Sequence, residues 1–305
     1  MRPAEGQTSR PDVEISRNTE ANYIRMIASE IRTVQTMTAA SVRSKSRTGK
    51  IAVIALNTFR ESVRDRVLYN LILFVLLLVC ASVFISELSI NQETKFIATL
   101  GLSSMLVFGA LIAIFIGVGL VYKEIDKRTI YNLLSKPVHR HEFIIGKYFG
   151  LCMTLLVNSA VMTLGTELAL VYVNQGLVPL QVSVLSAAYL IYLELALLIA
   201  VALMFSTFST PMLAALYTFA IYVIGHFSAD LKLAAELSES VAVRGLLTVL
   251  YYAVPNLSNF GFITEASHGQ VVPLRMAVSA TVYAIVYISI LLSASVLIFQ
   301  RRNFK

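Results

Sequence analysis

The sequence has few charged residues and few cysteines. Asp, Glu, Lys and Arg make up 14% of its 305 residues, against about 25% in an ordinary soluble domain. Hydrophobic residues make up 57%, and a soluble chain of this length could not bury so much apolar surface in one core. Both cysteines, Cys80 and Cys152, fall inside apolar stretches, so they are expected to pack as small hydrophobic residues rather than to form a disulfide or a metal pair. The composition predicts an all-α polytopic membrane protein.

Motifs of catalysis and nucleotide binding are also missing. The pair Gly146-Lys147 lacks the glycine that a phosphate loop requires five residues earlier, because His141 stands there. The chain contains no HExxH, GxSxG or CxxC motif. We therefore expect no catalytic residue, no metal site and no cofactor on this chain, and we do not expect it to be an enzyme. The polar start MRPAEGQTSR lacks the apolar region of a cleavable signal.

Six apolar segments have the roughly 20 residues that a membrane-spanning helix needs. They are 67–88, 96–122, 148–173, 183–208, 211–228 and 276–299. A seventh apolar run, 245–264, is interrupted by Pro255 and Asn256, and a span in contact with lipid could not leave such a break unsatisfied. Two half-helices, 241–254 and another after Pro255, explain the run better. We expect a re-entrant helical hairpin over 241–264, between the fifth and sixth spans.

The positive charges are distributed unequally along the chain. Residues 1–66, the loop 122–147 and the C-terminal RRNFK contain 21 of the 25 Lys and Arg residues. The positive-inside rule places these three regions, and hence both termini, in the cytoplasm. The net charge of +7 is explained by this orientation, and no nucleic-acid partner is expected.

The region before the first span divides in two. Residues 1–49 form a polar extension that we expect to be partly disordered, with a possible amphipathic helix beginning at Tyr23; residues 50–305 form the membrane domain. At the start of that domain an apolar stripe recurs at helical spacing, with polar residues on the other faces. The stripe is Ala52, Leu56, Phe59, Val63 and Val67, and the polar residues include Arg60 and Arg64. This pattern predicts an elbow helix that lies in the membrane interface.

Two carboxyl groups interrupt the apolar spans. Glu167 and Glu194 each lie about midway along a span, where an unpaired carboxylate costs several kcal/mol. One interpretation is a substrate or cation site, or a proton relay. The other is a hydrogen bond from a neutral carboxyl group to a neighbouring helix. The sequence leaves both open.

The loop 122–147 has the pattern of a docking element. Tyr122, Ile125, Ile130, Leu133 and Leu134 mark one face of a helix, charged residues fill the other, and Pro137 ends it. A second helix begins near residue 139 and leads into the third span. Mixed charges on a rigid loop favour docking to another protein over binding to anionic lipid.

The stretch VYKEIDKRTIYNLLSKPVHRHEFIIGKYFG, residues 121–150, resembles the permease subunits of ABC-2 type transporters. The nearest subgroup contains the permeases of nitrous oxide reductase maturation and of gliding motility. Three further stretches support the resemblance, which covers the chain from about residue 50: FRESVRDRVLYN at 59–70, FSTFSTP at 205–211 and VPNLSNF at 254–260. The resemblance implies six spans, an interfacial elbow helix that includes Phe59, Arg60 and Arg64, and re-entrant helices broken at Pro255 and Asn256.

The resemblance also gives the loop a role. In this family the loop carries the coupling helix, which docks on a separate ABC ATPase that binds ATP and Mg. The residues that match or flank this motif, and that are therefore expected to dock, are Glu124, Asp126, Lys127, Arg128, Thr129, Leu133, Leu134, Lys136, Pro137 and Arg140. The expected assembly pairs two permease copies, as a homodimer or heterodimer, with two ATPase copies. It would reside in the lipid bilayer of a bacterial inner membrane and work as an exporter.

Two other functions are compatible with the sequence. The chain could be a membrane module that uses ATPase motion for mechanical or signalling work, through an extracytoplasmic partner bound at residues 229–275. It could also be a secondary transporter in which protons move through Glu167 or Glu194. A neighbouring gene for an ATPase with Walker and LSGGQ motifs would favour the first two functions over the third.

Overall fold

The computed structural model describes residues 49–62, 93–126, 140–174, 176 and 179–301. Every regular element within these ranges is helical, which confirms the all-α class. A helix over residues 49–62 precedes the helices α3 (Glu93–Asp126), α5 (Arg140–Asn174), α6 (Leu180–Ser206), α7 (Pro211–His226), α8 (Ser228–Leu237), α9 (Val241–Ala253), the short 3-10 helix η1 (Leu257–Phe260), α10 (Ile263–Ser267) and α11 (Leu274–Arg301). The predicted first span, 67–88, and the extension 1–48 lie outside the described residues.

Four helices are long and apolar enough to cross a membrane: α3, α5, α6 and α11. They confirm the predicted spans 96–122, 148–173, 183–208 and 276–299. The predicted span 211–228 corresponds to α7, which has 16 residues and passes the same test only together with α8, to which it is bent by 66°. By length and composition, the described part of the chain therefore has up to six candidate spans, if each bent pair of helices is one span.

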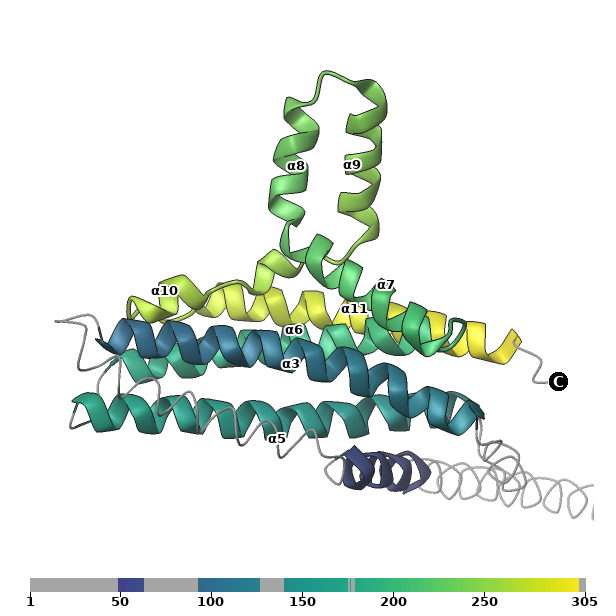
Figure 1. The fold of residues 1–305 in the computed structure, drawn as a ribbon, viewed down its shortest axis with the longest axis horizontal. Coiled ribbons are helices and arrows are strands. Elements are labelled where there is room, and N and C mark those ends of the chain that lie inside the picture. The colour runs from purple at the N-terminus through teal and green to yellow at the C-terminus, as the bar shows by residue number, and fades with distance from the viewer. Residues whose placement is uncertain (1–48, 63–92, 127–139, 175, 177–178, 302–305) are drawn as a thin grey trace, which may run out of the picture. The chain divides into compact units, whose positions relative to one another are not determined.

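Helix α6 is the centre of the bundle (Figure 1). It packs against α3, α5, α7 and α11, and most of its side chains are buried. A Cβ atom added to Gly109 of α3 would lie 2.4 Å from Leu195, and one added to Gly117 would lie 2.9 Å from Ala202. Small residues thus let α3 and α6 run side by side in the same direction, as is common between membrane helices.

The contacts between helices fix which ends lie together. Thr163 of α5 lies 3.6 Å from the sulfur of Met105 in α3, and Phe143 at the start of α5 stacks on Phe299 at the end of α11, with ring centroids 6.1 Å apart. The end of α3, the start of α5 and the end of α11 therefore lie at one end of the bundle, which we name the coupling end. The assignment of this end to the cytoplasm stays a prediction.

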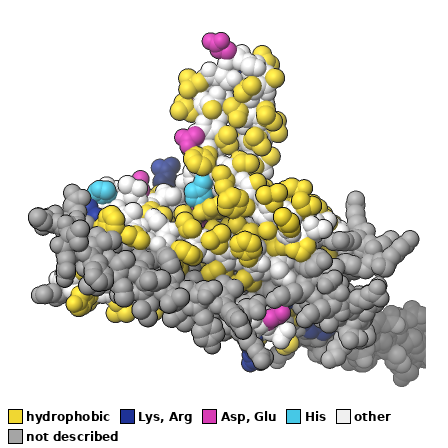
Figure 2. All heavy atoms as spheres, viewed as in Figure 1, with side chains coloured by type: hydrophobic (Ala, Val, Ile, Leu, Met, Phe, Trp, Pro, Cys, Tyr) yellow, Lys and Arg dark blue, Asp and Glu magenta, His cyan; other side chains and the backbone are white. Residues whose placement is uncertain are grey.

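The outer surface of the bundle is apolar. Many large hydrophobic side chains are exposed, among them Leu168, Met212 and Leu274, and Figure 2 shows hydrophobic side chains over much of the visible surface of α7 and of the α8–α9 hairpin. Such a surface suits contact with lipid chains. Lipid chains offer no hydrogen bonds, and the helices need none from them because the helical backbone satisfies its own polar groups.

The chain between α7 and α11 leaves the bundle and returns to it. Helices α8 and α9 pack against each other as a hairpin that projects from the side of the bundle (Figure 1). After Ala253 the path bends by 49°, and α10 packs again on α3 and α6. The first half-helix expected here, 241–254, is present as α9, but it pairs with α8, which precedes it, and not with a second half-helix after Pro255. After Pro255 come only η1 and the five-residue α10, because Pro255 and Asn256 interrupt the helix.

The helix over residues 49–62 packs on the first part of α5 through small residues. Its buried side chains are Ala55, Thr58 and Ser62, whereas Leu56 on the predicted apolar stripe is 45% exposed. A Cβ atom added to Gly150 would lie 2.6 Å from the Ala55 carbonyl oxygen. The apolar stripe is therefore free to face lipid, as an interfacial helix requires, while the small residues contact α5.

We expect Gly150→Val to displace the helix over residues 49–62 from α5, at a cost of about 1–3 kcal/mol for overpacking. The solubilised protein should then be cleaved faster by trypsin after Arg60, which is exposed in this helix. Gly119→Val is the matched control, since an added Cβ there meets no described atom within 4 Å. Equal cleavage rates in the two variants would contradict the close packing at Gly150.

Candidate functional site

Helices α3 and α5 continue beyond their apolar spans at the coupling end. The predicted apolar span of α3 ends at residue 122 and the helix continues to Asp126, a distance of about 6 Å at 1.5 Å per residue. Helix α5 begins at Arg140, about two turns before its predicted span. Glu124 and Asp126 thus end α3, and Arg140 begins α5. The other predicted docking residues lie outside the described residues: Lys127, Arg128, Thr129, Leu133, Leu134, Lys136 and Pro137.

Lys147 anchors the start of α5. Its side chain is only 2% exposed, and its Nζ lies 3.9 Å from Oε2 of Glu61 in the helix over residues 49–62. The same ammonium lies 5.8 Å from the ring centroid of Phe143, within the range of a cation–π interaction. A buried lysine is tolerated only where such partners replace water. Charge and stacking therefore join α5 both to this helix and to Phe299 of α11.

The predicted elbow residues lie beside this anchor. Phe59 is half-buried and Arg60 is exposed, whereas Arg64 lies outside the described residues. Neither of the two described residues is the ionic partner of α5; that partner is Glu61.

A carboxyl–imidazole pair lies inside the bundle. Glu194 of α6 is 1% exposed, and its Oε1 lies 3.5 Å from Nδ1 of His226, the last residue of α7. The His226 ring lies 4.8 Å from the ring of Tyr222, one turn earlier in α7. Neither Oε1 of Glu194 nor Nδ1 of His226 has a hydrogen-bond partner among the described residues. The pair can therefore bind a proton, or accept a polar group of a ligand, at the point where α7 ends.

Glu167 does not belong to this pair. It is half-buried in α5, and its Oε1 has no hydrogen-bond partner within the described part of the chain. Tyr192, two residues before Glu194 in α6, donates a hydrogen bond of 3.4 Å to the Cys152 carbonyl of α5, so Glu194 lies near the level of Cys152. Cys152 precedes Glu167 by about four helical turns. The two predicted carboxyl groups thus lie at different levels of the bundle.

Asn256 joins the segments that meet at the break after α9. Its backbone N–H donates to the Tyr283 hydroxyl of α11 at 2.7 Å. Its side-chain oxygen accepts from the backbone N–H of Ser258 at 3.1 Å, and from the hydroxyls of Ser228 and Ser258. Asn256 therefore connects η1 to the start of α8 and to α11 by hydrogen bonds. These bonds satisfy backbone N–H groups that lie outside an α-helix because Pro255 interrupts it.

Several residues of these sites were not predicted from the sequence. His226 is a single histidine at the end of an apolar run, and nothing local indicates its partner Glu194. The separation of Gly146 and Gly150 by three residues was the available signal for close packing, since such pairs mark helix contacts in membranes. Among the described residues, no three His, Cys, Asp or Glu side chains gather in a way that could hold a metal ion.

We expect Glu194→Gln and His226→Gln to be non-additive in the thermal unfolding of the solubilised protein. Their coupling free energy should be about 0.5–3 kcal/mol, as for residues in contact. Glu167→Gln combined with His226→Gln is the control pair and should be additive within about 0.5 kcal/mol, because these residues lie apart. Additive effects of the Glu194 and His226 changes would show that the 3.5 Å approach carries no interaction.

The comparison with known families agrees with this architecture. The family model described as "ABC-2 family transporter protein" matches residues 52–304, which includes every described helix except the first residues of the one over 49–62. No curated protein matches the chain. The chain belongs to the ABC-2 transporter family and is a multi-pass membrane protein.

Proposed function

We propose that this chain is the permease subunit of an exporter, driven by a separate ABC ATPase at a bacterial inner membrane. Two ATPase copies would bind ATP and Mg, and this chain would supply the path across the membrane, with both termini in the cytoplasm. Family membership makes the chain a membrane component of an ABC transporter.

The observation that carries the proposal is the extension of α3 and α5 beyond their apolar spans. Helices of 34 and 35 residues are about 50 Å long, whereas the hydrocarbon core of a bilayer is about 30 Å thick. Both helices continue past the apolar region at the coupling end, so the segment between them, 127–139, begins and ends away from the lipid chains. A soluble ATPase can bind there, and the predicted docking residues include Lys127 and Arg128.

Contacts around the start of α5 would carry motion from that segment into the bundle. Lys147 joins α5 to Glu61, and Phe143 stacks on Phe299 of α11. A displacement of α5 by the ATPase would therefore move the helix over residues 49–62 and α11 together with it. This is how ATP hydrolysis in another chain would shift one permease relative to a second copy, in a homodimer or a heterodimer.

Two alternatives each have an observation in their favour. The α8–α9 hairpin projects from the bundle (Figure 1), so residues 229–275 could contact an extracytoplasmic partner in a module that does mechanical or signalling work. The Glu194–His226 pair could bind protons in a secondary transporter. The subgroup of nitrous oxide reductase maturation and gliding-motility permeases remains our proposal on the strength of the motif at 121–150.

We expect the full-length chain to co-purify with the ABC ATPase encoded beside it and to stimulate its ATP hydrolysis. Reversing charge in the docking segment, with Glu124→Lys and Arg128→Glu together, should reduce co-purification at least about tenfold, since like charges across an interface cost several kcal/mol. Lys95→Glu is the matched control, because Lys95 is an exposed charge in the first turn of α3, at the opposite end of that helix.

Absence of any ATPase in the purified complex would contradict the proposal. So would unchanged co-purification after the double charge reversal, because the docking segment would then have no part in the interface.

A further inference from the structure

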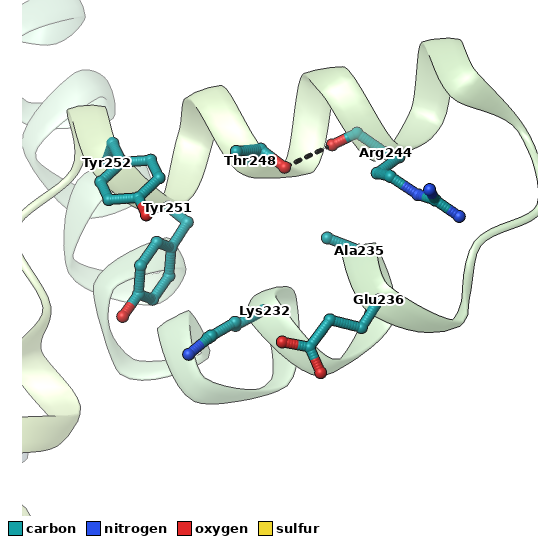
Figure 3. Close-up of a pocket in the computed structure, with 7 residues that line it drawn as sticks. All are labelled: Lys232, Ala235, Glu236, Arg244, Thr248, Tyr251 and Tyr252. Atoms are coloured by element: carbon teal, nitrogen blue, oxygen red, sulfur yellow. Dashed lines mark hydrogen bonds between the residues drawn. The ribbon is translucent and has the colours of Figure 1, made fainter.

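An open cavity lies between the two helices of the α8–α9 hairpin. The cavity has a volume of about 380 Å³ and is lined by Lys232, Ala235, Glu236, Arg244, Thr248, Tyr251 and Tyr252. Figure 3 shows that side chains from both helices border the gap. The volume lies within the range of about 300–1,000 Å³ that is usual for small-molecule sites. None of the residues on its wall is used by the function proposed above.

The two faces of the hairpin differ in polarity. Large apolar side chains on its outer surface are exposed, with Leu237 at 75% and Val249 at 65%, and Figure 2 shows mainly hydrophobic side chains on the visible face of the hairpin. No residue of α9 is buried. Helices of 10 and 13 residues are too short to be stable alone in water. The exposed apolar surface of the hairpin therefore needs a partner, which we take to be lipid or the apolar part of a ligand.

The cavity wall carries more positive than negative charge. Lys232 comes from α8 and Arg244 from α9, and Glu236 is the only acidic residue on the wall. The other acidic residues of the hairpin, Asp230 and Glu239, do not line the cavity. Within the described residues no ion pair joins Lys232, Glu236 and Arg244. The wall therefore has one uncompensated positive charge.

Arg244 and the tyrosines suit a ligand with a polar head and an apolar body. The guanidinium of Arg244 donates a hydrogen bond of 2.8 Å to the Ser238 carbonyl, which holds the hairpin turn and leaves other N–H donors for a ligand. Tyr251 and Tyr252 pack edge to face, with centroids 5.2 Å apart, and tyrosine is an amphipathic residue that prefers the boundary between polar and apolar surroundings. Ionisable residues on an apolar membrane segment commonly face such a cavity rather than lipid.

We infer that the cavity between α8 and α9 binds the anionic head group of an amphiphile, a phosphate or carboxylate, and that the apolar chains of the amphiphile lie along the outer face of the hairpin. Lys232 binds the anion and Glu236 weakens its binding, while Arg244 adds positive charge from the turn end of the hairpin, where its guanidinium points away from Lys232 (Figure 3). The inference rests on the proposed function in one respect, since the amphiphile would be a candidate cargo of the permease. Binding itself needs no ATPase, so the two ideas can fail separately.

The test measures lipid retained by the full-length chain after purification in detergent, by native mass spectrometry. The probes are phosphatidylglycerol and phosphatidylcholine with the same acyl chains, because they differ in net charge. We expect the wild-type protein to retain the anionic lipid about fivefold better, and Lys232→Gln to remove most of that preference, as for the loss of one charge-assisted hydrogen bond. Glu236→Gln should raise retention of the anionic lipid, a gain that a merely structural change would not produce.

Arg275→Gln is the matched control, since Arg275 is an exposed cation in α11 that does not line the cavity. Its lipid preference should equal that of the wild-type protein. Variants of Arg244 are less informative, because this residue also holds the hairpin turn. Helix content and elution volume of each variant establish that it is folded.

Three results would overturn the inference. Equal retention of the two lipids by the wild-type protein would leave the cavity as a surface for a protein partner. A loss of retention in Glu236→Gln as large as that in Lys232→Gln would show that the hairpin is only held together by these residues. Displacement of the lipid by millimolar inorganic phosphate would assign the site to a free anion rather than to an amphiphile.

Discussion

Every backbone N–H and C=O group inside a bilayer must find its partner within the protein, and the interrupted segment between α7 and α11 is organised around this constraint. The helix stops at His226 and again at Ala253, and polar side chains gather at both points. Asn256 binds Ser228, Ser258 and Tyr283, while Glu194 meets His226. At these two interruptions, polar side chains thus lie near backbone groups that the helices do not satisfy.

The sequence predicted the spanning helices well because the hydropathy of a span is a local property. Pro255 and Asn256 were likewise sufficient to predict a break in an apolar run. Pairings between distant residues were not predictable: α8 has the amphipathic sequence SADLKLAAEL, which resembles a surface loop until α9 is placed beside it. For the same reason the sequence indicated Glu194 as a polar site but not His226, which belongs to another helix.

In the helix over residues 49–62, the predicted elbow helix, the apolar stripe is not the face that packs on the rest of the protein. In water, the stripe of Ala52, Leu56 and Phe59 would be the face that packs on the core. Here the buried face consists of Ala55, Thr58 and Ser62, because lipid accepts apolar side chains and small residues allow helices to approach. Gly146 and Gly150 on α5 complete this contact.

The glycine contacts between α3 and α6 have a mechanical consequence. Because the side chains of Leu195 and Ala202 in α6 fit against Gly109 and Gly117 of α3, sliding of the two helices past one another would require these side chains to move out of the way. A push applied at the end of α3 would therefore be transmitted along its full length as translation or tilt of a stiff block. Bending is possible instead at residues 207–210 and at Phe227, where the helices are interrupted. A displacement that begins at the end of α3 would therefore change the angle at the base of the α8–α9 hairpin.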